Sequence, residues 1–154
     1  TEGHMTAGKR HRKIVTRFMD LAPLIRGRGA TLFVQSPITI EPGHEPEPDA
    51  CIVRGTPDDY DDRHPAPGDV FCLIEVADSS VDYDQTTKLR LYAHASIPQY
   101  VIVNLVDMQL EVYEQPLPAE SRYAQNIVLK AEQTLSLAVG AGKRLEVPAE
   151  SLLP

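Results

Sequence analysis

The sequence predicts an α/β fold with a mixed sheet, in which a helix, a three-strand meander, a second helix and another strand follow in that order. Three patterns support this prediction. Residues 9–25 have the apolar spacing of an amphipathic helix, residues 31–53 have the composition of two strands, and residues 71–106 have the strand–helix–strand order of a βαβ unit. Short apolar segments after residue 109 are expected to add strands at the edges of the sheet.

The first helix is predicted from apolar residues that recur every three or four positions: Ile14, Val15, Phe18, Met19, Ala22 and Ile25. Gly27 and Gly29 are expected to end it.

Two strands are predicted next, at residues 31–40 and 49–53, joined by an acidic, proline-rich connection into a hairpin. Pro37 indicates an edge or a bulge within the first of them. The following polar segment, residues 56–69, contains the run DDYDD, which could suggest calcium. Its spacing does not match an EF-hand, and a solvated loop is the favoured interpretation.

The strand at residues 71–74 is uniformly apolar, which is typical of a strand covered on both faces. Asp82 and Gln85 are spaced almost as in a capping box, so we expect a helix from about 83 to 95 that stops before Pro98. The next strand, residues 99–106, should then lie parallel to the first. Further strands are expected at residues 110–113, 123–130 and 135–139, and a short packed tail at residues 145–153.

Length and composition indicate one domain, spanning residues 9–154, since 154 residues with 42% apolar content suffice for a single core. Residues 1–8 begin with Thr-Glu-Gly-His-Met and are expected to be a cloning remnant or a disordered start. No apolar run is long enough for a membrane span, and we expect a soluble, cytoplasmic protein. Cys51 and Cys72 are expected to be buried, reduced thiols.

The net charge of −7 opposes any global attraction to nucleic acid, although residues 1–30 carry an excess of positive charge. A polyanion would approach the basic side chains of the first helix: Lys9, Arg10, Arg12, Lys13 and Arg17, with Arg26 and Arg28 beyond them. Composition alone favours the other interpretation, in which these residues form a solvated helix end.

Two carboxylates are placed where a strand begins or ends: Asp49 opens one strand after Pro48, and Glu75 closes a buried neighbouring strand. If these two strands pair, they could place the carboxylates of Asp49 and Glu75 close to each other. Hard cations such as Mg²⁺ choose oxygen ligands, so two carboxylates and a backbone carbonyl make a sufficient site. A nearby lysine would complete a site for phosphodiester hydrolysis.

The order of these elements resembles the PD-(D/E)xK nuclease superfamily. The series Ile74-Glu-Val-Ala-Asp-Ser-Ser, Asp84-x-x-x-Lys88-x-x-x-Tyr92 and Ser96-Ile-Pro-Gln-Tyr100 further resembles the bacterial family named "putative restriction endonucleases", long classed as a domain of unknown function. The resemblance extends from His11 to the C-terminus and implies a restriction-endonuclease-like core.

The resemblance also implies roles for individual residues. Asp49, Glu75 and Lys88 would be catalytic, and Mg²⁺ or Mn²⁺ would be held by Asp49, Glu75 and the backbone carbonyl of Val76. Asp84, Tyr92 and His11 would support the site.

The sequence departs from the superfamily pattern at Ala77, which occupies the usual lysine position two residues after the glutamate. In the family this lysine is thought to have moved to the next helix, which makes Lys88 the candidate. The family's N-terminal portion, which carries a further glutamate, is expected to be short or missing here, so no third carboxylate is assigned.

Each candidate also has an ordinary structural interpretation. Asp49 could be a turn residue, Lys88 and Asp84 a surface i,i+4 pair, and Tyr92 or His11 a packed ring. Glu75 is the hardest to explain in this way, because a glutamate that ends an apolar strand rarely lacks a partner.

The leading functional hypothesis is a Mg²⁺-dependent endonuclease, with DNA as the favoured substrate, bound weakly. The alternative is a catalytically inactive binding or assembly module with the same fold. No membrane partner is expected. A homodimer is expected, because at least one short strand must form an exposed edge and a symmetric duplex offers two scissile strands.

Overall fold

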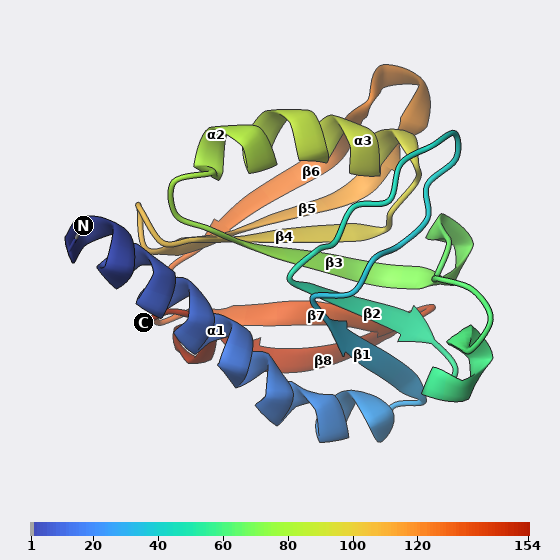
Figure 1. The fold of residues 1–154 in the computed structure, drawn as a ribbon, viewed down its shortest axis with the longest axis horizontal. Helices are drawn as coiled ribbons and strands as arrows, with labels where there is room; N and C mark the ends of the chain where they lie inside the picture. The colour runs from blue at the N-terminus through green and yellow to red at the C-terminus, as the bar shows by residue number, and fades with distance from the viewer. Residues whose placement is uncertain (1) are drawn as a thin grey trace.

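The computed structural model describes the backbone of residues 2–154 and the side chains of residues 8–154 (Figure 1). Residue 1 and the side chains of residues 2–7, which belong to the segment expected to be a cloning remnant or disordered start, lie outside the described residues. The first helix, α1, spans Glu2–Arg26 and therefore begins before the predicted residue 9.

A six-stranded sheet in the sequential order β1-β2-β3-β4-β5-β6 forms the centre of the molecule. All neighbouring pairs are antiparallel except β3 and β4, which are parallel as predicted for a βαβ crossover. The strands are β1 Ala30–Val34, β2 Ala50–Arg54, β3 Val70–Ala77, β4 Gln99–Asn104, β5 Gln109–Leu117 and β6 Arg122–Leu129. The α/β mixed-sheet prediction and its three-strand meander are confirmed.

The two faces of this sheet have separate cores. Helix α1 and a two-stranded sheet made of β7 (Thr134–Gly140) and β8 (Lys143–Pro148) cover one face (Figure 1). The helical segment between β3 and β4 covers the other face. Side chains of β3 alternate accordingly: Ile74 and Val76 join the α1 core, whereas Leu73 and Ala77 join the opposite core. Glu75 has the same parity as Leu73 and Ala77 along β3, so its side chain faces the helical segment.

That segment is one continuous helix with an irregular middle. It consists of α2 (Val81–Tyr83), a π-helical turn at Asp84–Lys88, and α3 (Leu89–His94). The expected start at Tyr83 with an Asp82 cap was wrong, because Ser80 occupies the N-cap position and no side-chain hydrogen bond caps the helix. Sequence patterns gave no indication of the π-helical turn.

Three strand predictions require correction. The first strand ends at Val34 rather than Ile40, because Gln35 has a positive φ of 50° and the chain turns away from the sheet. Residues 135–139 belong to a separate sheet rather than to an edge of the main one. The expected C-terminal tail contains strand β8, paired antiparallel with β7.

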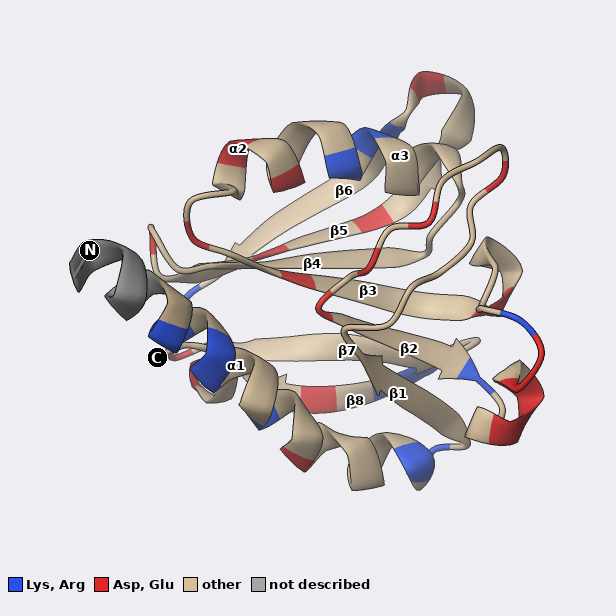
Figure 2. Cartoon of the chain, in the orientation of Figure 1, with Lys and Arg blue, Asp and Glu red and all other residues tan. Residues whose placement is uncertain are grey.

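Four short 3₁₀ turns complete the chain: Pro57–Tyr60, Pro67–Asp69, Pro118–Glu120 and Ala149–Leu152. Cys51 and Cys72 are both buried free thiols, as expected. Within the described residues, no helix is both long and apolar enough to cross a membrane. Lys and Arg residues gather on the described start of α1, and acidic residues are spread over the loops and strand ends (Figure 2).

Candidate active site

Asp49, which immediately precedes β2, and Glu75, in the neighbouring antiparallel strand β3, lie on the same face of the sheet. The register pairs Ala50 with Ile74, so Asp49, one residue earlier, lies opposite Glu75, one residue later. Directly opposed residues of an antiparallel pair project to the same side. The side chain of Glu75 is only 3% exposed and that of Asp49 is 14% exposed. The strand pairing thus brings together the two carboxylates that the sequence singled out.

Asp49 is held by the strand beside it and by α1. Its Oδ2 accepts a hydrogen bond of 2.7 Å from the backbone N–H of Val76. His11 Nε2, which projects from α1, lies 3.2 Å from Asp49 Oδ1. The hydrogen bond to Asp49 raises the pKa of His11, although partial burial opposes this rise. The first helix therefore contributes a donor to this site rather than only a packing surface.

Glu75 is buried and has two partners on the helical segment. Its Oε2 accepts a hydrogen bond of 2.9 Å from the Tyr92 hydroxyl and lies 3.2 Å from Lys88 Nζ. Burial raises the pKa of Glu75 to about 7; Lys88 opposes this shift, while the negative charge of Asp49 adds to it. One lysine and one hydroxyl thus compensate only part of the cost of burying this carboxylate.

Asp84 and Lys88 are the first and last residues of the π-helical turn. Lys88 Nζ lies 3.3 Å from Asp84 Oδ1 in addition to its contact with Glu75. Both carboxylates raise the pKa of Lys88 despite the opposing effect of burial. Asp84 is fixed from two sides, since Ser80 Oγ donates to its Oδ2 at 3.2 Å and the Tyr100 hydroxyl donates to its backbone carbonyl at 3.0 Å. Single π-helical turns of this kind are frequent at functional sites.

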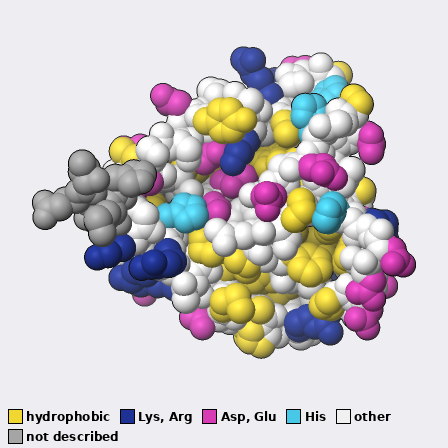
Figure 3. Space-filling view, in the orientation of Figure 1, with side chains coloured by type: hydrophobic (Ala, Val, Ile, Leu, Met, Phe, Trp, Pro, Cys, Tyr) yellow, Lys and Arg dark blue, Asp and Glu magenta, His cyan; other side chains and the backbone are white. Residues whose placement is uncertain are grey.

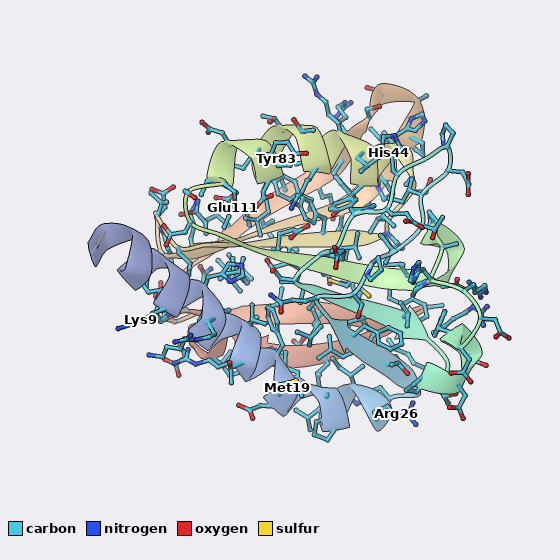
Figure 4. All side chains as sticks on the ribbon, viewed as in Figure 1. Lys9, Met19, Arg26, His44, Tyr83 and Glu111 are labelled. Carbon is cyan, nitrogen blue, oxygen red and sulfur yellow. The ribbon has the colours of Figure 1, made fainter. Side chains whose placement is uncertain are left out.

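Glu111, a buried carboxylate on β5, was not identified as a site residue from the sequence. It accepts hydrogen bonds from the side-chain amides of Gln85 at 2.7 Å, Asn104 at 2.8 Å and Gln109 at 2.9 Å. Gln85 lies inside the π-helical turn, so Glu111 ties this turn to the sheet (Figure 4). A strand was expected at residues 110–113, but the burial of this glutamate depends on the helical segment that covers the strand.

These residues surround a pocket of about 320 Å³ at the end of the sheet, where acidic side chains gather around a hollow (Figure 3). The side chains and backbone that line it belong to Gly8, His11, Glu47, Asp49, Glu75, Val76, Asp78, Ser79, Ser80, Asp84 and Lys88. Five carboxylates therefore face one lysine and one histidine. Among the described residues, no group of three or more His, Cys, Asp or Glu side chains is close enough to form a metal site by itself.

The basic residues of α1 divide into two groups. Lys9, Arg12 and Lys13 are exposed, whereas Arg10 donates to the Leu105 carbonyl at 2.5 Å and Arg17 donates to the Leu153 carbonyl. The two arginines thus hold α1 against other parts of the chain. Gly8 and His11 line the pocket, so the three exposed cations are their neighbours along α1, and Lys9 projects away from the sheet (Figure 4).

The mixed sheet with helices on both faces makes this a domain of restriction-endonuclease-like fold, in which Asp49 and Glu75 lie beside Lys88 of the crossover helix. A family model identifies it more closely: Uma2, described as "Putative restriction endonuclease", matches residues 2–148, and the chain belongs to this family. The resemblance inferred from the sequence is thereby confirmed.

The solved structure of "a putative nuclease belonging to DUF820" from Anabaena variabilis ATCC 29413 has the same fold. The TM-score is 0.63 at 15% sequence identity, over 93% of this chain and 79% of that chain. Comparison with curated proteins gave no match.

Because burial raises the pKa of Glu75 from 4.5 to about 7, the folded protein holds this proton more tightly than the unfolded chain does. The stability that this bound proton adds to the folded state is fully present below the pKa of Glu75 in the unfolded chain. It is lost as the pH rises through the pKa of about 7 in the folded protein. We expect Glu75 to remove roughly 3 kcal/mol of unfolding free energy over this window, at about 1.4 kcal/mol for each unit of pKa difference. Urea unfolding of the wild type and of Glu75→Gln between pH 4.5 and 8 measures it.

Glu75→Gln, which is neutral at every pH, should show a flatter stability profile than the wild type. Glu146→Gln, at an exposed position of β8, is the matched control and should follow the wild-type profile. Parallel profiles for the wild type and Glu75→Gln would show that Glu75 does not titrate in this range.

Proposed function

We propose that this protein is a Mg²⁺- or Mn²⁺-dependent endonuclease that hydrolyses phosphodiester bonds of nucleic acid, with DNA as the favoured substrate. A cytoplasmic location belongs to the same proposal. The observation that carries it is the buried Glu75 carboxylate, in contact with Lys88 and opposite Asp49, in a pocket with an excess of negative charge.

The residues fit a divalent cation of the Mg²⁺ type. Asp49, Glu75 and the Val76 carbonyl would hold it, and all three supply the oxygen ligands that Mg²⁺ prefers. The Val76 N–H is directed toward β2, since it donates a hydrogen bond to Asp49. The N–H and C=O of one strand residue point to the same side of the strand, so the Val76 carbonyl is directed toward β2 as well. The raised pKa of Glu75 supports this assignment, because it indicates a carboxylate that lacks sufficient positive charge around it.

The ion, when bound, would supply Lewis-acid stabilisation of the phosphate charge and a lowered pKa for coordinated water. The chain's own residues have complementary roles. Lys88, whose ammonium group lies between Glu75 and Asp84, would donate to the attacking water or to a phosphate oxygen. Tyr92 would keep Glu75 oriented toward the pocket, and His11 would do the same for Asp49.

A cleavage assay on plasmid and oligonucleotide DNA with Mg²⁺ or Mn²⁺ tests this proposal. We expect metal-dependent cleavage by the wild type and losses of at least about 10²-fold for Asp49→Asn, Glu75→Gln and Lys88→Met, because removing one preorganised charge-stabilising donor costs about that much. The exposed residues Glu146 and Lys143 provide controls: Glu146→Gln and Lys143→Met should keep wild-type activity.

If folded wild-type protein binds nucleic acid but cleaves neither DNA nor RNA with either metal, the inactive binding module becomes the preferred function. Equal activity of Lys88→Met and the wild type would refute the role of the helix lysine, while leaving the acid pair to be judged by its own variants.

DNA binding should be weak and moderately salt-dependent. Arg10 and Arg17 are engaged by backbone carbonyls, which leaves Lys9, Arg12, Lys13 and Lys88 to neutralise phosphates. Four contacts correspond to a log–log salt slope of about −4 on duplex DNA. Binding isotherms at several salt concentrations measure the slope, with Ca²⁺ as a probe for the acid pair. Neutralising Arg12 and Lys13 should reduce the slope by about 2, and an unchanged slope would show that α1 is only a solvated face.

A homodimer formed through the β6 edge is also part of the proposal. Ile127 and Val128 are adjacent, point to opposite faces of the strand, and are 55% and 45% exposed, so neither face of this edge strand is covered at these two positions. We expect sedimentation equilibrium to show a dimer at micromolar concentration that Ile127→Lys dissociates. Met19→Lys, at a similarly exposed position on α1, is the control. A wild-type monomer throughout this range would contradict the proposal.

A further inference from the structure

Tyr83 presents an exposed aromatic ring next to the pocket. All nine Phe and Tyr side chains lie within residues 8–154, which the structure describes, and Tyr83 is the only exposed one among them, at 53%. It ends α2 immediately before the π-helical turn (Figure 4). Its ring is therefore available for contact with a ligand that occupies the pocket.

The π-helical turn is what brings this ring to the pocket. In an α-helix, residues five apart point about 140° away from each other, since each residue turns the chain by about 100°. The i→i+5 hydrogen bonding of a π-helical turn widens it by one residue and brings positions five apart closer in direction. Tyr83 and Lys88 are five apart across this turn, and Lys88 Nζ lies 5.7 Å from the centre of the Tyr83 ring. The same ammonium lies 3.2 Å from Glu75.

Lys88 therefore connects the aromatic ring to the acid pair. A phosphate that reaches Lys88 and the acid pair leaves the base of an adjacent nucleotide within reach of Tyr83. Aromatic side chains bind such bases by stacking, which is tolerant of sequence because every base has a π-face. In an intact duplex both faces of a base are covered by its neighbours, so stacking on Tyr83 requires an unpaired or displaced base.

We propose that Tyr83 is a nucleobase-binding residue, which stacks an unpaired base next to the phosphate held at Lys88 and gives the site a preference for single-stranded over duplex nucleic acid. This inference rests on the proposed nuclease function and specifies the part of the substrate that the site recognises. Lys88 takes part in both the base contact and the phosphate contact. Its ammonium group lies over the Tyr83 ring and also lines the pocket in which the phosphate would bind.

Binding to single-stranded and duplex oligonucleotides of the same sequence, with Ca²⁺ in place of Mg²⁺, tests the inference separately from cleavage. The oligonucleotides carry one 2-aminopurine, whose fluorescence falls when it stacks on an aromatic ring. We expect Tyr83→Ala to weaken single-strand binding by about 5- to 150-fold, the range that corresponds to one stacked base. Duplex binding should change less than twofold. Tyr83→Phe and Tyr83→Trp should retain both affinity and quenching.

Met19→Ala controls for loss of an exposed apolar side chain away from the pocket, and it should leave both affinities unchanged. Equal single-strand affinity and quenching in Tyr83→Ala and the wild type would overturn the inference, even if the wild type cleaves DNA. A matched loss on single strand and duplex without a change in quenching would also overturn it, because Tyr83 would then act only by holding Lys88.

Cleavage by the wild type decides the proposed function independently of these binding results. A wild type that binds single strands through Tyr83 but never cleaves would refute the nuclease and leave a base-binding module.

Discussion

The burial of the Glu75 carboxylate is the constraint to which the other parts of the site respond. A carboxylate with 3% of its side chain exposed loses nearly all of its hydration, and this costs several kcal/mol unless other groups compensate. The helical segment supplies these groups through the Tyr92 hydroxyl and the Lys88 ammonium. Each is fixed by packing of the helix on the sheet. Glu111 and Tyr100 add hydrogen bonds from β5 and β4 that hold the π-helical turn in place. The groups that compensate the burial of Glu75 therefore also attach the helical segment to the sheet.

The sheet topology explains why the two acidic residues meet. β2 and β3 run antiparallel, so the start of β2 lies beside the end of β3, and Asp49 and Glu75 share one end of the sheet. The parallel β4 then requires a crossover, which passes over the face to which both carboxylates point. α1 closes the same end and brings His11 to Asp49. Strand direction therefore brings the two carboxylates and the crossover helix together, and the packing of α1 on the sheet adds His11.

Sequence patterns predicted those features that depend on local periodicity. The apolar spacing located α1, and the uniform apolar runs located β3 and β4, because each of these elements is buried through its own side chains. The positions of Asp49 and Glu75 at strand ends indicated a shared site. Features that depend on distant partners could not be predicted in this way. Glu111 is buried by a helix 26 residues earlier, Arg10 binds a carbonyl 95 residues away, and strand propensity does not show that β7 and β8 form their own sheet.

The position of Ala77 accounts for a lysine on the helix rather than on the strand. Residues 75 and 77 have the same parity on β3, so a lysine at position 77 would project toward the face that the helical segment covers. Ala77 is fully buried there, in the core that contains Tyr92 and Ala93, and a lysine would have to displace that packing. Lys88 reaches the same face from the covering element itself, with 26% of its side chain exposed to the pocket. The helix position thus allows an ammonium group beside Glu75 and an unbroken apolar core beneath it.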